Sequence, residues 1–440
     1  MSRAGTRTPR RAVVFGAGKM ACGLIGHVLT RSGFTVQFVA RRADVVNAIN
    51  GHHGYRLHIA GRAEPELIRG CSALRLQDAE EVTLAVATAD VVFTAVGIGN
   101  LAAVTPAIHA GLFLRTQLRG DVPLNVIACE NLPGTGAYLG HQILCAGSPG
   151  TRLCVERVGG FSAATTRRVM TGGVPRSGEL CFSVDSEHPL VIDAAGLKGA
   201  LPPLQGAVTT DQFAAELMRK FFTVNCAQAV AAYVGYRHGC KYIHEAVAHP
   251  EVAPVVTAAL AEATAALKAE FPGQAAGIET DAAEVLDRLA SGEPADPIYR
   301  VGREPRRKLS PRERLVGPAR LAQRHGLPTE ALAQAIAAAL AYDAPNDPQA
   351  AGLQQTIANE SLETVLTEDC GLLPHEPLAR RVKHHWQRLA LAEPLGHAAA
   401  VPAAWTRSGV PERLQALVFD LARQYDPKLV LQALARVPAA

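Results

Sequence analysis

AVVFGAGKMACGLIG, residues 12–26, is the stretch that decides the fold of this chain. An apolar run is followed by Gly16-Ala17-Gly18, and residues 19–26 then continue with the apolar spacing of a helix. This order predicts a buried strand, a tight glycine turn and a helix that begins at the turn. Gly16 permits the turn, and Gly18 lets backbone N–H groups and the positive end of the helix approach an anion. The stretch therefore predicts the pyrophosphate loop of a dinucleotide-binding βαβ unit, with an ordinary tight turn as the alternative.

The strand predicted next, over residues 35–40, ends at Ala40 and is followed by Arg41-Arg42, with no acidic residue before Asp44. In dinucleotide-binding units an acid at this position binds the adenosine ribose, whereas arginine accommodates a 2′-phosphate. We therefore expect NADP in preference to NAD, and two solvated arginines are the alternative. The candidate cofactor-binding residues are Gly16, Ala17, Gly18, Lys19, Met20, Arg41, Arg42, Ala95 and Val96.

Strand and helix patterns alternate through the first part of the chain and change to helix alone in the second. Further strands are predicted over 55–59, 90–96, 124–129 and 179–184, and helices over 44–50 and 100–109. Long alanine-rich segments of helical period follow, over 211–236, 252–271, 282–290, 329–342 and 378–391. The fold class is therefore α/β, with an N-terminal Rossmann-type doubly wound domain over 1–195. A mainly helical substrate and catalytic domain is predicted over 196–395, and a helical C-terminal extension over 396–440.

The composition of the 440 residues is that of a globular protein, 48% hydrophobic and 19% charged. The net charge of +4 is too small to indicate nucleic acid as a partner. Nine scattered cysteines form no CxxC pair, which favours a reduced cytoplasmic location over a zinc site or a disulfide framework. The basic N-terminus imitates a signal peptide, but Lys19 interrupts the apolar stretch behind it, and no apolar run is long enough to span a membrane. We expect a monomer or a homodimer.

Two further stretches hold candidate catalytic residues. KFFTVNCAQ, residues 220–228, is predicted to be helical, so Lys220 and Asn225 lie about 140° apart while Asn225 and Gln228 share a face. A lysine in an apolar helix can exchange a proton with a substrate hydroxyl, and asparagine amides can hold an oxygen that gains negative charge. Asn131 directly follows the strand over 124–129, at the edge where open parallel sheets bind ligands. The alternatives are ordinary polar residues of a helix and a turn-forming asparagine.

RVGREPRRKLSPRER, residues 300–314, carries seven basic residues. It contains two glutamates and lacks the interleaved aromatic residues of a nucleic-acid-binding segment. A solvated loop and a binding site for a phosphorylated substrate remain as the two interpretations.

Several motifs together resemble the polyol-specific long-chain dehydrogenase family, and its mannitol-1-phosphate 5-dehydrogenases most of all. The similar stretches run in the same order from about residue 12 to about residue 390. They are FGAGKMACGLIG at the start, TAVG at 94–97, PLNVIACEN at 123–131, LKGALP at 197–202, RKFFTVN at 219–225, AYVG at 232–235, RVGREPRRKLS at 300–310, RERL at 312–315 and HGLP at 325–328.

This resemblance implies an NAD(P)-dependent oxidoreductase that interconverts a ketose phosphate of the fructose 6-phosphate type and a polyol phosphate, in the reductive direction. It implies that Lys220 is the general acid/base and that Asn131 and Asn225 hold the alkoxide oxygen, with no metal. It also implies that the substrate is bound by Arg300 and Lys308, with Arg303 and Arg307 beside them for a phosphate. Gln228 stands where the family has histidine, and it can bind a hydroxyl but cannot carry a proton.

Three other positions depart from the family pattern. Cys22 replaces an arginine of the glycine loop, Arg167-Arg168 replaces an aspartate-arginine pair, and Ala40 replaces the aspartate of NAD users. Arginine in place of an acid favours a more anionic ligand. Two alternative functions are a relative recruited to a biosynthetic pathway, with a different anionic keto or hydroxy substrate, and a non-catalytic cofactor-binding protein that uses its tail for protein contacts.

Overall fold

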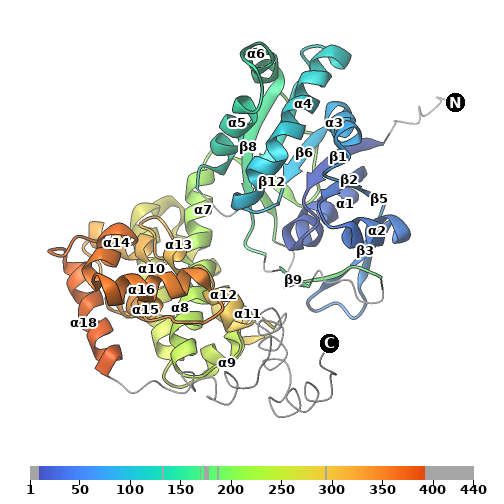
Figure 1. Ribbon diagram of the computed structural model, residues 1–440. Coiled ribbons are helices and arrows are strands. Elements are labelled where there is room, and N and C mark those ends of the chain that lie inside the picture. Colours follow the sequence, from blue (N-terminus) through green and yellow to red (C-terminus); the bar gives the residue numbers. More distant parts are fainter. Residues whose placement is uncertain are drawn as a thin grey trace, which may run out of the picture. The chain divides into compact units, whose positions relative to one another are not determined.

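The computed structural model describes residues 9–130, 133–168, 170–172, 178–185, 188–292 and 295–391 (Figure 1). The chain divides into two compact units, each treated below by itself. The first is built from Met1–Asn225 and Phe271–Asp296, and the second from Cys226–Glu270 and Pro297–Ala440. The tail predicted to be helical over 396–440 lies outside the described residues.

The first unit is organised around a sheet of eight strands. Six parallel strands have the order β5-β2-β1-β6-β7-β8, and they are β5 (Cys71–Arg75), β2 (Phe34–Ala40), β1 (Arg10–Phe15), β6 (Val91–Thr94), β7 (Leu124–Ala128) and β8 (Gly159–Thr165). Beyond β8, β11 (Leu190–Asp193) runs antiparallel to it and β12 (Ala207–Thr210) runs parallel to β11. This is the strand order of a doubly wound dinucleotide-binding sheet, so the predicted α/β Rossmann fold is confirmed.

Helices cover both faces of the sheet. Successive residues of the central strand β1 are therefore buried in two different cores. Ala12 and Val14 face η1 (Ala21–Gly26), α1 (His27–Arg31) and α2 (Ala43–His52). Val13 and Phe15 belong to the core formed with α3 (Ala79–Thr88), α4 (Leu101–Arg119), α5 (Thr135–Cys145) and α6 (Pro149–Val158). A strand buried on both faces reads as a continuous apolar run, as residues 12–15 do.

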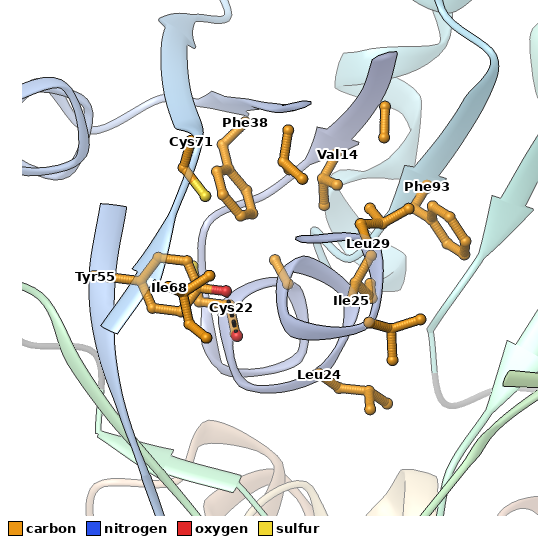
Figure 2. Close-up of a cluster of buried hydrophobic side chains, with 14 of the residues drawn as sticks. Val14, Cys22, Leu24, Ile25, Leu29, Phe38, Tyr55, Ile68, Cys71 and Phe93 are labelled. Carbon is orange, nitrogen blue, oxygen red and sulfur yellow. Dashed lines mark hydrogen bonds between the residues drawn. The ribbon is translucent and has the colours of Figure 1, made fainter. Parts of the chain in front are cut away.

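Two predicted strands, 55–59 and 179–184, exist but belong to a separate sheet. Its order is β4-β3-β10-β9, from β4 (Glu66–Arg69), β3 (Gly54–Ile59), β10 (Cys181–Val184) and β9 (Met170–Gly172). Tyr55 and Ile68 of this sheet pack beside Cys22 of η1, and the Tyr55 hydroxyl donates a hydrogen bond of 2.7 Å to the Cys22 carbonyl (Figure 2). The small sheet thus supports the helix that follows the glycine loop.

The helix predicted over 19–26 is present, but residues 21–26 form a π-helix rather than an α-helix. Wide π turns leave some carbonyls poorly paired, and Tyr55 satisfies the one at Cys22. Gly26 makes this contact possible, since a Cβ there would lie 2.4 Å from the Tyr55 hydroxyl oxygen.

The single helix predicted over 211–236 is wrong, because the chain breaks at Thr223. Helix α7 (Phe213–Phe222) ends there and α8 (Val224–Arg237) begins after it. Thr223 has φ −106° and ψ −87°, and its hydroxyl donates 2.7 Å to the Arg219 carbonyl. A threonine that bonds back to the preceding turn competes with the backbone ladder, and β-branched Thr-Val favours the break. The assumed 140° between Lys220 and Asn225 therefore does not apply.

The remaining helices of the first unit are η2 (Ile98–Asn100), η3 (Pro272–Gln274) and α11 (Ala275–Ala290). The described part of the second unit contains the C-terminal part of α8 and the helices α9 (Ile243–Ala248), α10 (Ala253–Glu270), α12 (Ile298–Gly302), α13 (Pro305–Lys308), α14 (Val316–Arg324), α15 (Glu330–Leu340), α16 (Pro348–Asn359), α17 (Leu362–Glu368) and α18 (Pro377–Leu391). Helix α15 is buried along almost its whole length and packs against α10 and α18. Among the described helices, none is long and apolar enough to cross a membrane.

Candidate active site

A cavity of about 290 Å³ opens at the carboxyl ends of the central strands of the first unit. Seven of the nine predicted cofactor-binding residues line it: Gly16, Ala17, Gly18, Arg41, Arg42, Ala95 and Val96. Lys19 and Met20 are not among the lining residues, and Met20 instead packs against the core. The glycine loop, the end of β2 and the end of β6 thus meet around one space.

The two glycines of the loop have different structural roles. Gly16 has φ +101°, and a Cβ there would stand 2.5 Å from the Ala95 carbonyl oxygen, so only glycine fits between β1 and the end of β6. Gly18 is exposed, and a Cβ there would meet no atom within 4 Å. Protein packing does not require glycine at Gly18, and the open backbone beside the cavity fits the close approach of a pyrophosphate.

The two arginines after β2 differ in their partners. Arg42 forms a two-pronged ion pair with Asp44, with Nε 3.0 Å from Oδ1 and Nη2 close to Oδ2. This contact raises the pKa of Arg42 and lowers the pKa of Asp44. Arg41 makes no hydrogen bond or ion pair to any described residue and is exposed at the cavity. Of the pair, Arg41 is the guanidinium available to a ligand.

Lys220, the predicted general acid/base, lies buried in the last turn of α7. Its ammonium donates 3.2 Å to the hydroxyl of Thr165, the last residue of β8. Burial and Glu130 raise the pKa of the Cys129 thiol, and the nearby Lys220 charge partly opposes them. Since β7 and β8 are neighbouring parallel strands, the contact with Thr165 places the ammonium at the edge of the sheet where their carboxyl ends lie.

Of the two predicted oxyanion-binding asparagines, the structure describes Asn225, whereas Asn131 lies outside the described residues. Asn225 is in the first turn of α8 and is 7% exposed. Its buried Nδ2 has no hydrogen-bond partner among the described residues. An orphaned buried amide is costly, so this N–H group is suited to an incoming oxygen.

A buried ion-pair network adjoins Lys220 and was not predicted from the sequence. Asp281 of α11 accepts hydrogen bonds from Arg219, at 2.7 and 3.2 Å, and from Arg167. Arg219 also contacts Glu216 at 2.8 Å. This network holds the last turn of α7, in which Lys220 lies, against α11. The sequence offered no signal, because Asp281 is 62 residues away from Arg219.

Glu130, at the end of β7, is a second residue that the sequence interpretation left without a role. It is 7% exposed and accepts hydrogen bonds from the Thr94 hydroxyl, at 3.0 Å, and from the Val96 N–H, at 3.1 Å. Burial raises the pKa of Glu130, and the two hydrogen bonds oppose that shift. The carboxylate therefore connects the end of β7 to the segment of β6 that lines the cavity.

The basic stretch 300–314 belongs to the second unit, and most of its charges have protein partners. Lys308 is buried and its ammonium donates to the carbonyls of Val301 and Arg303. Burial lowers the pKa of Lys308 well below its usual range, and the charges of Arg314 and Arg307 lower it further. The lysine thus ties the end of α12 to α13 while leaving one N–H to donate.

The three predicted arginines of this stretch are not equivalent. Arg307 contacts Glu304 at 2.7 Å and Glu313 at 3.1 Å. The side chain of Arg303 is 60% exposed and reaches Glu304 only at 3.8 Å, so it is the more available cation. Arg300 is half-buried in α12, and Gln228 is half-buried on α8 of the same unit.

Of the departures from the family pattern, Ala40 lines the cavity, whereas Cys22 and the Arg167-Arg168 pair are held by contacts within the protein. Cys22 is fully buried and is not among the residues that line the cavity. Arg167 pairs with Asp281, and Arg168 is buried and donates 3.0 Å to the Gly23 carbonyl of η1. In the described part of the chain, no group of three or more His, Cys, Asp or Glu side chains is arranged to hold a metal ion.

Comparison with family models assigns both halves of the chain. Residues 10–206 match the mannitol dehydrogenase Rossmann domain, and residues 214–390 match the mannitol dehydrogenase C-terminal domain. The mannitol-1-phosphate 5-dehydrogenase of Bacillus velezensis is 36% identical over 372 residues, which cover 83% of this chain and 97% of that protein. The mannitol-1-phosphate 5-dehydrogenase of Brevibacillus brevis is 35% identical over 384 residues, covering 86% and 98%.

Solved structures show the same fold at low sequence identity. Mannitol 2-dehydrogenase of Pseudomonas fluorescens, in a ternary complex with NAD and D-mannitol, has a TM-score of 0.67 at 14% identity and covers 87% of this chain and 92% of that one. A substrate-free D-sorbitol dehydrogenase has a TM-score of 0.66 at 13% identity, covering 86% and 93%. The chain therefore belongs to the mannitol dehydrogenase family and is an oxidoreductase that acts on a CH–OH group.

Proposed function

We propose that this protein reduces a ketose phosphate of the fructose 6-phosphate type to the corresponding polyol phosphate, with NADPH as the reductant. The relatives named above are mannitol-1-phosphate 5-dehydrogenases. The observation that carries the chemistry is the buried ammonium of Lys220. It lies at the carboxyl ends of β7 and β8, within the unit that contains the glycine-lined cavity. Ligands of open parallel sheets bind at this edge.

The preference for NADPH is supported by the residues at the end of β2. Ala40 offers no carboxylate to a ribose hydroxyl, and the carboxylate of Asp44 is occupied by Arg42. Arg41 lines the cavity without a partner among the described residues. A guanidinium binds phosphate oxygens through charge-assisted hydrogen bonds, so Arg41 is the group that we assign to the 2′-phosphate.

When bound, a reduced nicotinamide dinucleotide would supply the hydride that the carbonyl carbon of the substrate accepts. Lys220 donates a proton to the carbonyl oxygen, so that the ketone becomes an alcohol, and Lys220 then recovers a proton from water. The N–H groups of Asn131 and Asn225 hold the oxygen while it carries negative charge. The orphaned Nδ2 of Asn225 supports this role.

The phosphate of the substrate is assigned to the basic stretch of the second unit. We propose that Arg300, Arg303, Arg307 and Lys308 bind it, with Gln228 donating to a substrate hydroxyl. Arg303 should contribute most, because Glu304 and Glu313 already neutralise Arg307.

The experiment compares fructose 6-phosphate with fructose as substrates while NADPH consumption is followed by absorbance. We expect kcat/KM to be at least about tenfold higher for the phosphorylated sugar, as one charge-assisted phosphate contact provides. Arg303→Gln should reduce this ratio. Arg312→Gln, an exposed arginine of the same stretch, serves as the matched control and should leave it unchanged. Equal rates on both sugars would contradict the proposed substrate class.

A further inference from the structure

The backbone at Val96 leaves the sheet at the wall of the cavity. The last sheet bonds of this segment are those of Ala95, whose N–H donates 2.8 Å to the Phe15 carbonyl, and of Thr94, whose carbonyl accepts 2.9 Å from Cys129. At Val96, the backbone N–H and the backbone carbonyl both bond to side chains instead of to a neighbouring strand. Its N–H donates 3.1 Å to Glu130, and its carbonyl accepts 2.9 Å from the Asn100 amide.

Glu130 is the more unusual of these two partners because it is a buried carboxylate without a countercharge. Its other oxygen accepts 3.0 Å from the hydroxyl of Thr94, which is fully buried. No described cation lies within ion-pair distance of Glu130. An uncompensated buried carboxylate opposes folding, and burial accordingly raises its pKa. A carboxylate at this position therefore needs a reason other than stability.

The contacts of Val96 indicate that reason. Ala95 and Val96 line the cavity, and the Ala95 carbonyl is the atom that Gly16 must approach closely. The segment that Glu130 holds is thus the wall facing the pyrophosphate loop. If the Val96 N–H lost its acceptor, this wall would have to turn toward another acceptor, and the cavity would change shape.

We propose that Glu130 is a positioning residue for the cofactor: by accepting hydrogen bonds from Val96 and Thr94, it fixes the cavity wall at the end of β6 in the form that binds the dinucleotide. The inference rests on the proposed function only in requiring a nicotinamide dinucleotide in this cavity. It holds for either NADPH or NADH. Because the role is geometric, a neutral side chain that hydrogen-bonds to the same two partners should also serve.

Three variants test this role, with the fluorescence of reduced dinucleotide as the binding assay and both NADPH and NADH as probes. Glu130→Leu has a side chain of similar size but no hydrogen-bond acceptor. It should reduce the affinity for the tighter-binding dinucleotide by about tenfold or more. Glu130→Gln can accept from Val96 through Oε1 and donate to Thr94 through Nε2, so it should bind within about threefold of the wild type. Thr94→Val removes one of the two hydrogen bonds to Glu130, so its affinity for the dinucleotide should lie between those of Glu130→Leu and Glu130→Gln.

Glu262→Leu is the matched control, since Glu262 also accepts hydrogen bonds from two backbone N–H groups, those of Ala331 and Leu332, in the second unit. It should alter thermal stability but not dinucleotide affinity. With saturating dinucleotide, Glu130→Leu should regain most of kcat and keep the KM for the sugar phosphate. General damage to the fold would instead lower kcat even at saturating dinucleotide.

The outcomes distinguish the inference from the proposed function. Wild-type affinity in Glu130→Leu overturns the inference, and so does a loss in Glu130→Gln as large as that in Glu130→Leu, which would mean that the charge matters. If the wild type binds neither NADPH nor NADH, the proposed function fails and the inference fails with it. If the wild type binds but reduces no sugar phosphate, only the proposed substrate fails.

Discussion

Alanine at Gly16 and alanine at Gly18 should affect different properties of the protein, although only Ala17 separates the two glycines. At Gly16 the backbone has φ +101°, which costs an L-residue about 1–3 kcal/mol. The added Cβ would also stand 2.5 Å from the Ala95 carbonyl oxygen, and such overpacking costs about 1–3 kcal/mol. Gly16→Ala should therefore lower the free energy of unfolding by about 2–6 kcal/mol.

Gly18→Ala should leave the free energy of unfolding within about 0.5 kcal/mol of the wild type, because its Cβ would meet no atom within 4 Å. It should nevertheless weaken NADPH binding, since the methyl group would occupy the space that the pyrophosphate needs. Urea unfolding followed by circular dichroism measures the first quantity, and titration of NADPH fluorescence measures the second. Undiminished NADPH affinity in Gly18→Ala, or wild-type stability in Gly16→Ala, would refute the assignment of this loop.

Three further predictions concern charges. Arg41→Ala should reduce the affinity for NADPH by about tenfold with little effect on the affinity for NADH, whereas Arg42→Ala should reduce the NADPH affinity less. Equal effects of the two substitutions in fluorescence titrations would contradict the assignment of Arg41. The pKa of Glu130 is raised in the folded wild type, so its free energy of unfolding should fall as the pH rises above the ordinary pKa of glutamate, about 4.3. Glu130→Gln lacks this titration, so its free energy of unfolding should increase relative to that of the wild type between about pH 4 and pH 8. Urea unfolding at several pH values measures the difference, and a difference that stays constant would contradict the prediction. Asp281→Asn should lower the free energy of unfolding by about 3 kcal/mol, because it removes the buried carboxylate that Arg219 and Arg167 share and leaves Arg219 with Glu216 alone. A loss under about 1 kcal/mol would show that the network contributes little.

The parts of the fold that follow from local patterns were predictable. The strand of residues 12–15, the glycine turn and the doubly wound sheet all depend on short apolar runs and on glycine chemistry. The break at Thr223 was not predicted, because an uninterrupted apolar pattern conceals the hydroxyl that bonds back to Arg219. The π form of residues 21–26 was not predicted either, because the Tyr55 hydroxyl that bonds to the Cys22 carbonyl comes from β3, 33 residues along the chain.

The candidate site was likewise predictable only in part. The lining of the cavity by Arg41 followed from its position after a strand, but the pairing of Arg42 with Asp44 required geometry. Glu130 had no pattern to distinguish it, since one glutamate after a strand resembles any solvated residue. Its contacts with Thr94 and Val96 join positions more than 30 residues apart, and only the folded chain brings them together.

The most direct measurement is the rate at which Lys220→Ala and the wild type oxidise NADPH in the presence of fructose 6-phosphate, with NADPH affinity determined for both. The proposal predicts a wild type that turns over and a variant that binds NADPH normally but loses about 10²-fold or more of kcat, the usual contribution of a general acid. A variant that retains the wild-type rate would contradict the role of Lys220. A wild type that binds NADPH but oxidises none with this sugar phosphate would contradict the proposed reaction.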